Sequence, residues 1–182
     1  GHINGVHVTS NKKIAITWYD DSIRKRNNPS SYSYDICGDQ LIPIDLIGKE
    51  YIVLKGNIYV GDDGGERFFV TATQNSTAIY VNGTYRTTIN AGQVYNEQIN
   101  SNVTRIVASK PVYVNHISGT GGGGEFGGAT LPSVENCTGS HKVTFTRNQM
   151  AADPLQLNVM VRNETNPASP LHNQSIQNFT LT

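Results

Sequence analysis

The segment from Glu66 to Gly119 restricts the possible folds more than any other part of the 182-residue chain. Its apolar and β-branched residues come in short runs, and a cluster of turn-forming residues ends each run, as at Asn82-Gly83 and Asn90-Ala91-Gly92. None of these runs is long enough for an ordinary helix, and apolar positions alternate with polar ones. The pattern predicts consecutive antiparallel β-strands.

Two details of this segment predict where strands turn or end. Ile79 and Val81 share one face of a strand, and the Asn82-Gly83 pair that follows supplies the positive φ angles of a tight hairpin turn. Lys110-Pro111 indicates a break between strands, because proline cannot donate a ladder hydrogen bond and belongs at the start of a strand or at an edge.

The rest of the chain also has a β pattern, and no segment of it predicts a convincing helix. A polar stretch over residues 20–36, rich in Ser and Tyr, predicts a loop. Strands are predicted on both sides of the Glu66–Gly119 segment, at Gly5–Thr9, Lys13–Trp18, Glu50–Lys55, Lys142–Thr146 and Gln156–Arg162.

Short pieces of sequence recur along the chain, as where Lys12–Ile16 resembles Lys110–Val114. Four such pairs have offsets of 98, 89, 91 and 89 residues, which indicates two copies of one β unit. We therefore predict an all-β, antiparallel, sandwich-like domain over residues 1–182, built from two similar halves of about 90 residues, roughly 1–90 and 91–182. A propeller-like arrangement of β repeats is the alternative.

Composition argues against several classes of function. Lys plus Arg equals Asp plus Glu at 14 each, so a charge-driven binder of nucleic acid is not expected. No apolar run is long enough to span a membrane, so direct membrane insertion is not expected either. A surface with only 15% charged residues, made mostly of amides and hydroxyls, is typical of extracellular β proteins. Since no initiator Met or signal peptide is visible, we expect a piece of a longer secreted or cell-surface protein.

Two groups of residues are candidates for a metal site or a disulfide. Asp62, Asp63 and Glu66 surround two glycines and offer the oxygen ligands that calcium prefers, although a tight charged turn is the competing interpretation. No other cofactor is expected. Neither Cys37 nor Cys137 lies in a CxxC pair, so the two either form one disulfide or are buried as separate thiols.

Two predicted loops are candidates for ligand binding. One contains Tyr32 and Tyr34, whose rings can provide contact area at low entropic cost, and the other contains Glu125 and Phe126. Catalysis is not predicted. His116 and Ser118 share a strand face, but no acid, oxyanion hole or GxSxG motif accompanies them.

A set of motifs between about residues 36 and 150 resembles, in combination, the IgGFc-binding protein N-terminal domain family, as found in large bacterial cell-surface adhesin-like proteins. The resemblance implies a non-catalytic module of a secreted, multi-domain protein. It also implies that a cysteine usually found where this chain has Gly121–Glu125 is missing, which leaves Cys37 as a possible partner of Cys137. The motifs are Gly38–Pro43, Gly48–Val53, Gly65–Arg67, Val70–Asn75, Ile79–Gly83, Asn90–Tyr95, Ala108–Val114, Gly127–Pro132 and Cys137–Ser140.

These observations favour a binding module with an adhesive or structural role over an enzyme. The expected partner is a protein or glycan ligand at a surface, or neighbouring modules of the same polypeptide. A carbohydrate-binding module is the alternative function, and an enzyme is the remaining one.

Overall fold

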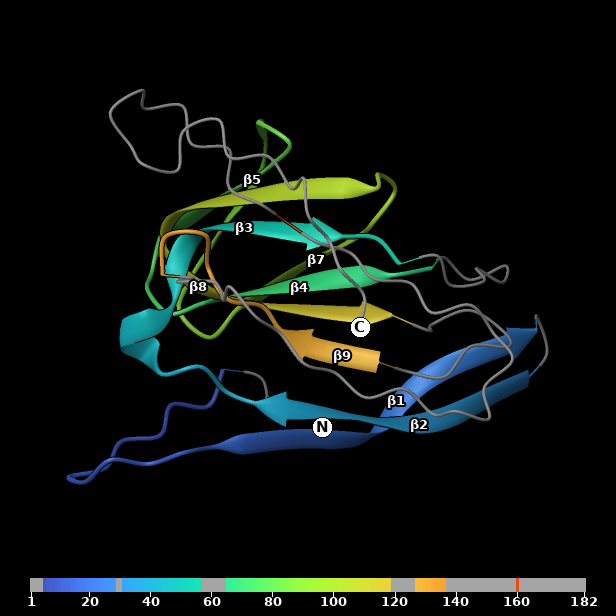
Figure 1. Cartoon of the computed structure of the whole chain (residues 1–182), viewed down its shortest axis with the longest axis horizontal. Helices are drawn as coiled ribbons and strands as arrows, with labels where there is room; N and C mark the ends of the chain where they lie inside the picture. Colours follow the sequence, from blue (N-terminus) through green and yellow to red (C-terminus); the bar gives the residue numbers. More distant parts are fainter. Residues whose placement is uncertain (1–4, 29–30, 57–64, 119–126, 137–159, 161–182) are drawn as a thin grey trace, which may run out of the picture. The chain divides into compact units, whose positions relative to one another are not determined.

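A computed structural model describes residues 5–28, 31–56, 65–118, 127–136 and 160 (Figure 1). All the described residues except Met160 belong to one compact unit, Gly1–Gln149, and the second unit is Met150–Thr182. The described part contains a single 3-10 turn, η1 (Ile44–Leu46), and is otherwise β structure. The strands are β1 (Thr17–Asn28), β2 (Ser31–Gln40), β3 (Gly48–Leu54), β4 (Arg67–Ala72), β5 (Thr77–Val81), β6 (Thr84–Ile89), β7 (Val94–Gln98), β8 (Val103–Ser118) and β9 (Gly127–Thr130).

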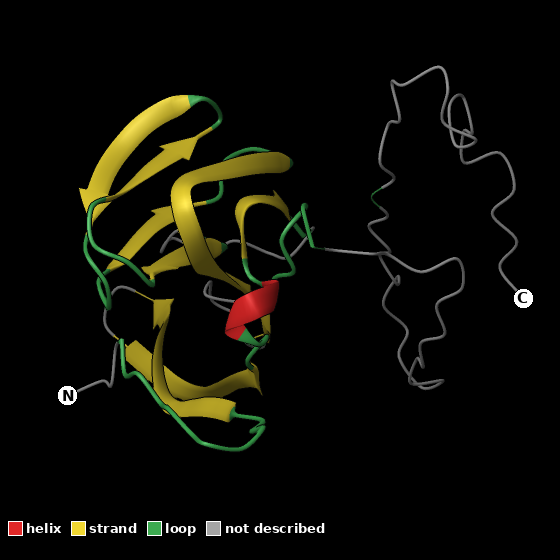
Figure 2. Cartoon of the chain, turned by 90° about the vertical axis from the view of Figure 1, so that its left-hand side faces the viewer, coloured by secondary structure: helices red, strands yellow, loops and turns green. Residues whose placement is uncertain are grey.

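The long strand β8 organises the larger of the two antiparallel sheets. Its first part, Val103–Ala108, pairs with β3 on one side and β5 on the other. Its second part, Val112–Ser118, pairs with β4 and β9, and Val112 also pairs with Gly48 of β3. The order along the sheet is therefore β6-β5-β8-β4-β7, with β3 and β9 also on β8. Figure 2 shows that the strands curl strongly, so that the two parts of the sheet enclose a core. The predicted all-β, antiparallel, sandwich-like fold is confirmed.

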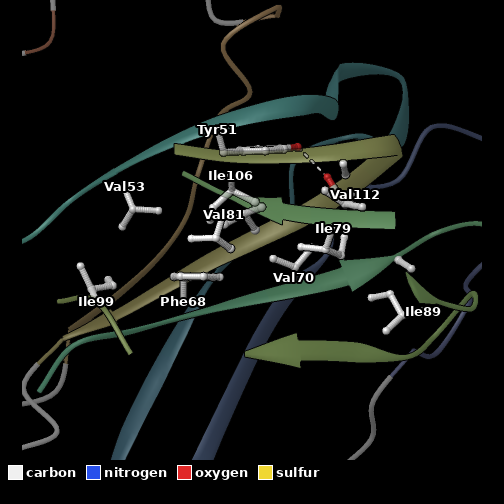
Figure 3. Packing of buried hydrophobic residues seen from close by; sticks show 13 residues of the cluster. Tyr51, Val53, Phe68, Val70, Ile79, Val81, Ile89, Ile99, Ile106 and Val112 are labelled. Atoms are coloured by element: carbon white, nitrogen blue, oxygen red, sulfur yellow. Dashed lines mark hydrogen bonds between the residues drawn. The ribbon is translucent and has the colours of Figure 1, made fainter. Parts of the chain in front are cut away.

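One hydrophobic core lies between the two parts of the sheet (Figure 3). In β8, Ile106, Ala108, Val112 and Val114 all point into it, because residues two apart along a strand share a face. The largest fully buried side chains are Tyr51, Phe68, Ile79, Ile99 and Ile106. Four of them come from different strands, Ile99 follows the end of β7, and all belong to one core cluster.

The Asn82-Gly83 turn forms as predicted, with φ angles of 50° and 80° between β5 and β6. The prediction for Pro111 was wrong, because this proline lies inside β8. Gly48 pairs with Val112 but Glu50 pairs with Val107, so the register shifts and β8 has extra residues at this point. Since Pro111 has no cross-strand partner among the paired residues, its missing N–H interrupts no ladder.

The N-terminal region also differs from the prediction. Residues 20–36 form most of a long hairpin rather than a loop, because β1 pairs with β2 from Thr17↔Gln40 to Asn28↔Ser31. Main-chain hydrogen bonds make this pairing, so it does not need the apolar alternation on which a sequence-based prediction depends. The strands predicted at Gly5–Thr9 and Lys13–Trp18 are likewise wrong for residues 5–16, since the first strand begins at Thr17.

Candidate binding surface

Exposed apolar side chains are concentrated in the first quarter of the chain. Eight of the thirteen exposed large hydrophobic residues in the described part lie between residues 6 and 46. Large apolar side chains left exposed in one region of a chain are candidates for an interaction site. We call the first six of these residues the N-terminal apolar surface: Val6, Val8, Ile14, Tyr19, Tyr34 and Ile36.

The β1–β2 hairpin presents three of these side chains on one face. Tyr19 pairs with Gly38, and Tyr34, Ile36 and Gly38 alternate along β2, so all lie on the same side. The exposed fractions are 76% for Tyr19, 66% for Tyr34 and 64% for Ile36. Gly38 is required here, because a Cβ atom at this position would lie 2.8 Å from the Cβ atom of Tyr19.

The opposite face of the hairpin is fixed to the larger sheet. Cys37 is buried, and its Sγ atom lies so close to Gly128 of β9 that a Cβ atom there would be only 2.1 Å away. The Asp39 carboxylate accepts a hydrogen bond of 2.7 Å from the Thr130 backbone N–H. Because these contacts hold one face, the hairpin presents the other face to solvent as a supported surface.

A second candidate group lies where β3, β4 and β8 meet. The side chain of Glu66 is only 3% exposed, and its Oε2 atom lies 2.7 Å from Nε2 of His116. The same oxygen accepts a hydrogen bond from the Gly56 backbone N–H, while Oε1 is buried without a hydrogen-bond partner in the described part of the chain. A buried carboxylate needs such partners, so this pair connects the end of β3 to β8.

The calcium prediction stays a prediction. Asp62 and Asp63 lie outside the described residues, and Glu66 contacts His116. Within the described ranges no three His, Cys, Asp or Glu side chains are grouped as metal ligands. The histidine and serine considered for catalysis have different partners, since Ser118 donates to the Gly127 carbonyl at 3.3 Å and His116 contacts Glu66.

The other predicted site residues have mixed outcomes. Tyr32 and Tyr34 lie in β2 and not in a loop, and Tyr34 is exposed. Glu125 and Phe126 lie outside the described residues, as does Cys137, so the disulfide with Cys37 stays a prediction. The exposure of Val6, Val8 and Ile14 was not predicted, because each residue belongs to a segment whose apolar pattern is that of a buried strand.

A third polar group lies on β6 and β7 and is partly exposed to solvent. The Tyr95 hydroxyl donates to the Glu97 carboxylate, and the Arg86 guanidinium lies 2.9 Å from the same carboxylate. Burial, followed by the bond to Glu97, raises the pKa of Tyr95 to about 12. The Arg86–Glu97 contact joins β6 and β7, the strands at the two ends of the sheet order, which is a structural role.

The sequence comparisons agree with a binding role. The model of the IgGFc binding protein family matches residues 1–179, so the chain belongs to this family, and the match is longer than the resemblance over residues 36–150. Neither a curated protein nor a solved structure matches the chain. The family is one of binding modules associated with surface or secreted proteins. No helix in the described residues is long and apolar enough to cross a membrane.

Proposed function

We propose that this member of the IgGFc binding protein family is a non-catalytic, protein-binding module of a secreted or cell-surface protein, with an adhesive or structural role. One observation supports the proposal: the N-terminal apolar surface is exposed in a unit whose other large apolar side chains are mostly buried or half-buried.

The energetics of this surface favour a protein partner. Covering a side chain such as Ile36 or Tyr34 contributes about 1.5–3 kcal/mol, so three or four such contacts support a stable complex. The formal net charge of the chain is zero, so binding of the partner does not depend on long-range electrostatic attraction. Part of the surface, Tyr19, Tyr34 and Ile36, lies on β1 and β2, and strands bind other proteins through main-chain hydrogen bonds.

Site-specific photo-cross-linking in the full-length parent protein on its native surface tests the proposal. A photo-reactive phenylalanine analogue at Tyr34 should give an adduct with a protein, identified by mass spectrometry. The same analogue at Thr84, an exposed residue on β6, is the matched control and should give none. The absence of a protein adduct specific to Tyr34 would contradict the proposal.

A carbohydrate-binding module is the second candidate, because the exposed rings of Tyr19 and Tyr34 are suited to stacking on sugars. Binding of the isolated chain to a glycan array at millimolar sugar, lost in Tyr19→Ser and Tyr34→Ser, would favour this candidate. No binding under these conditions would exclude it.

A further inference from the structure

Two hairpins in this unit have the same register, although they are far apart in sequence. In β1–β2, the four pairs run from Thr17↔Gln40 to Asp20↔Cys37. In β8–β9 they run from Asn115↔Thr130 to Ser118↔Gly127. Each of the four paired residues of β1 is thus 98 positions before its counterpart in β8, and each of the four in β2 is 90 positions before its counterpart in β9.

The hydrogen bond that follows each hairpin also has a counterpart. The Leu41 N–H donates to the Ile16 carbonyl at 2.8 Å, and the Leu131 N–H donates to the Val114 carbonyl at the same distance. The offsets are again 98 for the acceptors and 90 for the donors. The same offset of 98, carried back along the sequence through the similar segments Lys12–Ile16 and Lys110–Val114, aligns residues 5–20 with the whole of β8.

The exposed apolar residues of this segment occupy positions that are buried in β8. Val6 corresponds to Thr104, Val8 to Ile106, Ile14 to Val112 and Tyr19 to Ile117. The exposed fractions are 63%, 52%, 51% and 76% in the N-terminal segment, against 3%, 0%, 0% and 8% in β8. The segment therefore has the apolar pattern of a strand that completes a sheet, which we call a closing strand. In the described part of the chain, however, no sheet covers these four side chains.

The contacts of β8 show what such a segment needs. Ile106 is buried because Tyr51 of β3 and Val81 of β5 pair with it on its two sides. Val112 is buried between Gly48 of β3 and Ala72 of β4. In this unit the strands β3, β4 and β5 cover these positions.

We propose that residues 5–20 are the closing strand of a second unit of the same fold, located N-terminal to them in the polypeptide and containing counterparts of β3 to β7. This inference rests on the proposed function and identifies the protein partner. The proposal describes a row of units joined by long strands. The first part of each long strand completes the sheet of one unit, and its second part is the first strand of a hairpin in the next unit.

The connection between strands supports a partner in the same polypeptide. In this chain β7 ends at Gln98 and β8 begins at Val103, so a short turn leads from a unit directly into its closing strand. A second copy of this chain does not offer the same position, because its own β8 already lies between β3 and β5. The partner must therefore be a unit that lacks its own closing strand.

Hydrogen–deuterium exchange on a tandem protein tests the inference. Residues 41–102, which include β3 to β7, are fused directly to Gly5 of the full chain, so that Gly5 follows Asn102 as Val103 does naturally. In the tandem protein, we expect the backbone amides of residues 6–20 to exchange at least about 100-fold more slowly than in the unfused chain. Equal exchange rates in the two proteins would overturn the inference, provided that β8 stays protected and so shows that the chain itself is folded.

Two variants of the tandem protein separate a specific closing strand from general crowding. Val8→Asp places a charge at the counterpart of buried Ile106 and should abolish the protection of residues 6–20. His7→Asp changes the counterpart of exposed Arg105 and should preserve it. Equal protection in both variants would contradict the proposed register. The two proposals can be contradicted separately. If the tandem protein shows no added protection but Tyr34 cross-links to an unrelated protein, the further inference is wrong and the proposed function is supported.

Discussion

At the scale of single residues, Tyr51 shows how one side chain stabilises the place where β8 passes from one set of partners to the other. Its ring is fully buried, and its hydroxyl donates to the Val112 carbonyl at 2.5 Å and accepts from the Gly48 N–H at 3.0 Å (Figure 3). Gly48 and Val112 are paired residues beside the register shift. The hydroxyl therefore satisfies backbone groups at an irregular point of the ladder.

Replacing Tyr51 with Phe should destabilise the unit by about 1–3 kcal/mol, because it leaves a buried carbonyl and a buried N–H each without this partner. Urea unfolding followed by fluorescence measures the change. Tyr85→Phe is the control: its hydroxyl is exposed and contacts only Thr88, so the cost should stay within about 0.5 kcal/mol. Equal costs for the two variants would show that the buried hydroxyl has no special role.

The same hydroxyl predicts a dependence of stability on alkaline pH. Burial is the main cause that raises the pKa of Tyr51 from 10.0 to about 12. An unfolded tyrosine ionises near pH 10, so Tyr51 contributes stability that is complete below this pH and is lost as the pH rises towards about 12. The free energy of unfolding, measured from pH 9 to 12, should therefore fall less steeply in Tyr51→Phe than in the wild type. Parallel curves would be the contrary result.

The Glu66–His116 pair makes a second prediction at this scale. His116→Ala leaves the buried Glu66 carboxylate with a single described hydrogen bond, from Gly56, and should cost about 3 kcal/mol in urea unfolding. The double variant with Glu66→Gln and His116→Gln removes the charge and should recover part of this loss. If the double variant is less stable than His116→Ala, the buried charge is not the cause.

At the scale of elements, the sequence was informative wherever alternation and turn chemistry act together. Ile79 and Val81 alternate beside Asn82-Gly83, and this hairpin has the predicted turn. The β1–β2 hairpin was missed because main-chain pairing maintains it while polar side chains occupy both strands. Pro111 was misplaced because a register shift removes the need for its N–H, and such shifts depend on the partner strand rather than on local sequence.

The candidate surface was predicted only in part, for a related reason. Tyr34 was identified as a binding residue from its residue type, and it is exposed. Val8 and Ile14 have the pattern of a buried strand, and periodicity alone cannot reveal that no sheet covers them in this unit. The comparison of their positions with β8 distinguishes a strand buried in its own unit from one that is exposed there, and that comparison needs the register of both hairpins.

The packing of β2 against β9 gives a prediction for these elements. A Cβ atom at Gly128 would lie 2.1 Å from Sγ of Cys37, so Gly128→Ala should cost about 1–3 kcal/mol in urea unfolding. Cys37→Ala removes the sulfur, and in this background the Gly128→Ala cost should be smaller by at least about 0.5 kcal/mol, as a double-mutant cycle measures. Additive effects would show that the hairpin is held elsewhere, for example through Asp39 and Thr130.

At the scale of the whole molecule, the hydrophobic core of the described unit does not include its first residues. Every residue of the core cluster lies between Tyr51 and Val114, apart from the partly buried Leu131 packed against it. The N-terminal segment contributes none of them, although Gly5 lies against Gly92 in the turn between β6 and β7. A segment with a strand-like apolar pattern thus lies outside the core of its own unit, which agrees with a role in contacting another one.

Deleting residues 1–13 is the whole-molecule test of this separation. The deletion keeps Ile16, which accepts the hydrogen bond from Leu41, and should change the free energy of unfolding by no more than about 0.5 kcal/mol. Ile106→Ala, at the counterpart of Val8 inside the closed sheet, should instead cost about 2–5 kcal/mol, because it creates a cavity beside Tyr51 and Val81. Urea unfolding of both variants gives the comparison. If the deletion costs as much as Ile106→Ala, residues 1–13 belong to the core of this unit, and they are not available to close another.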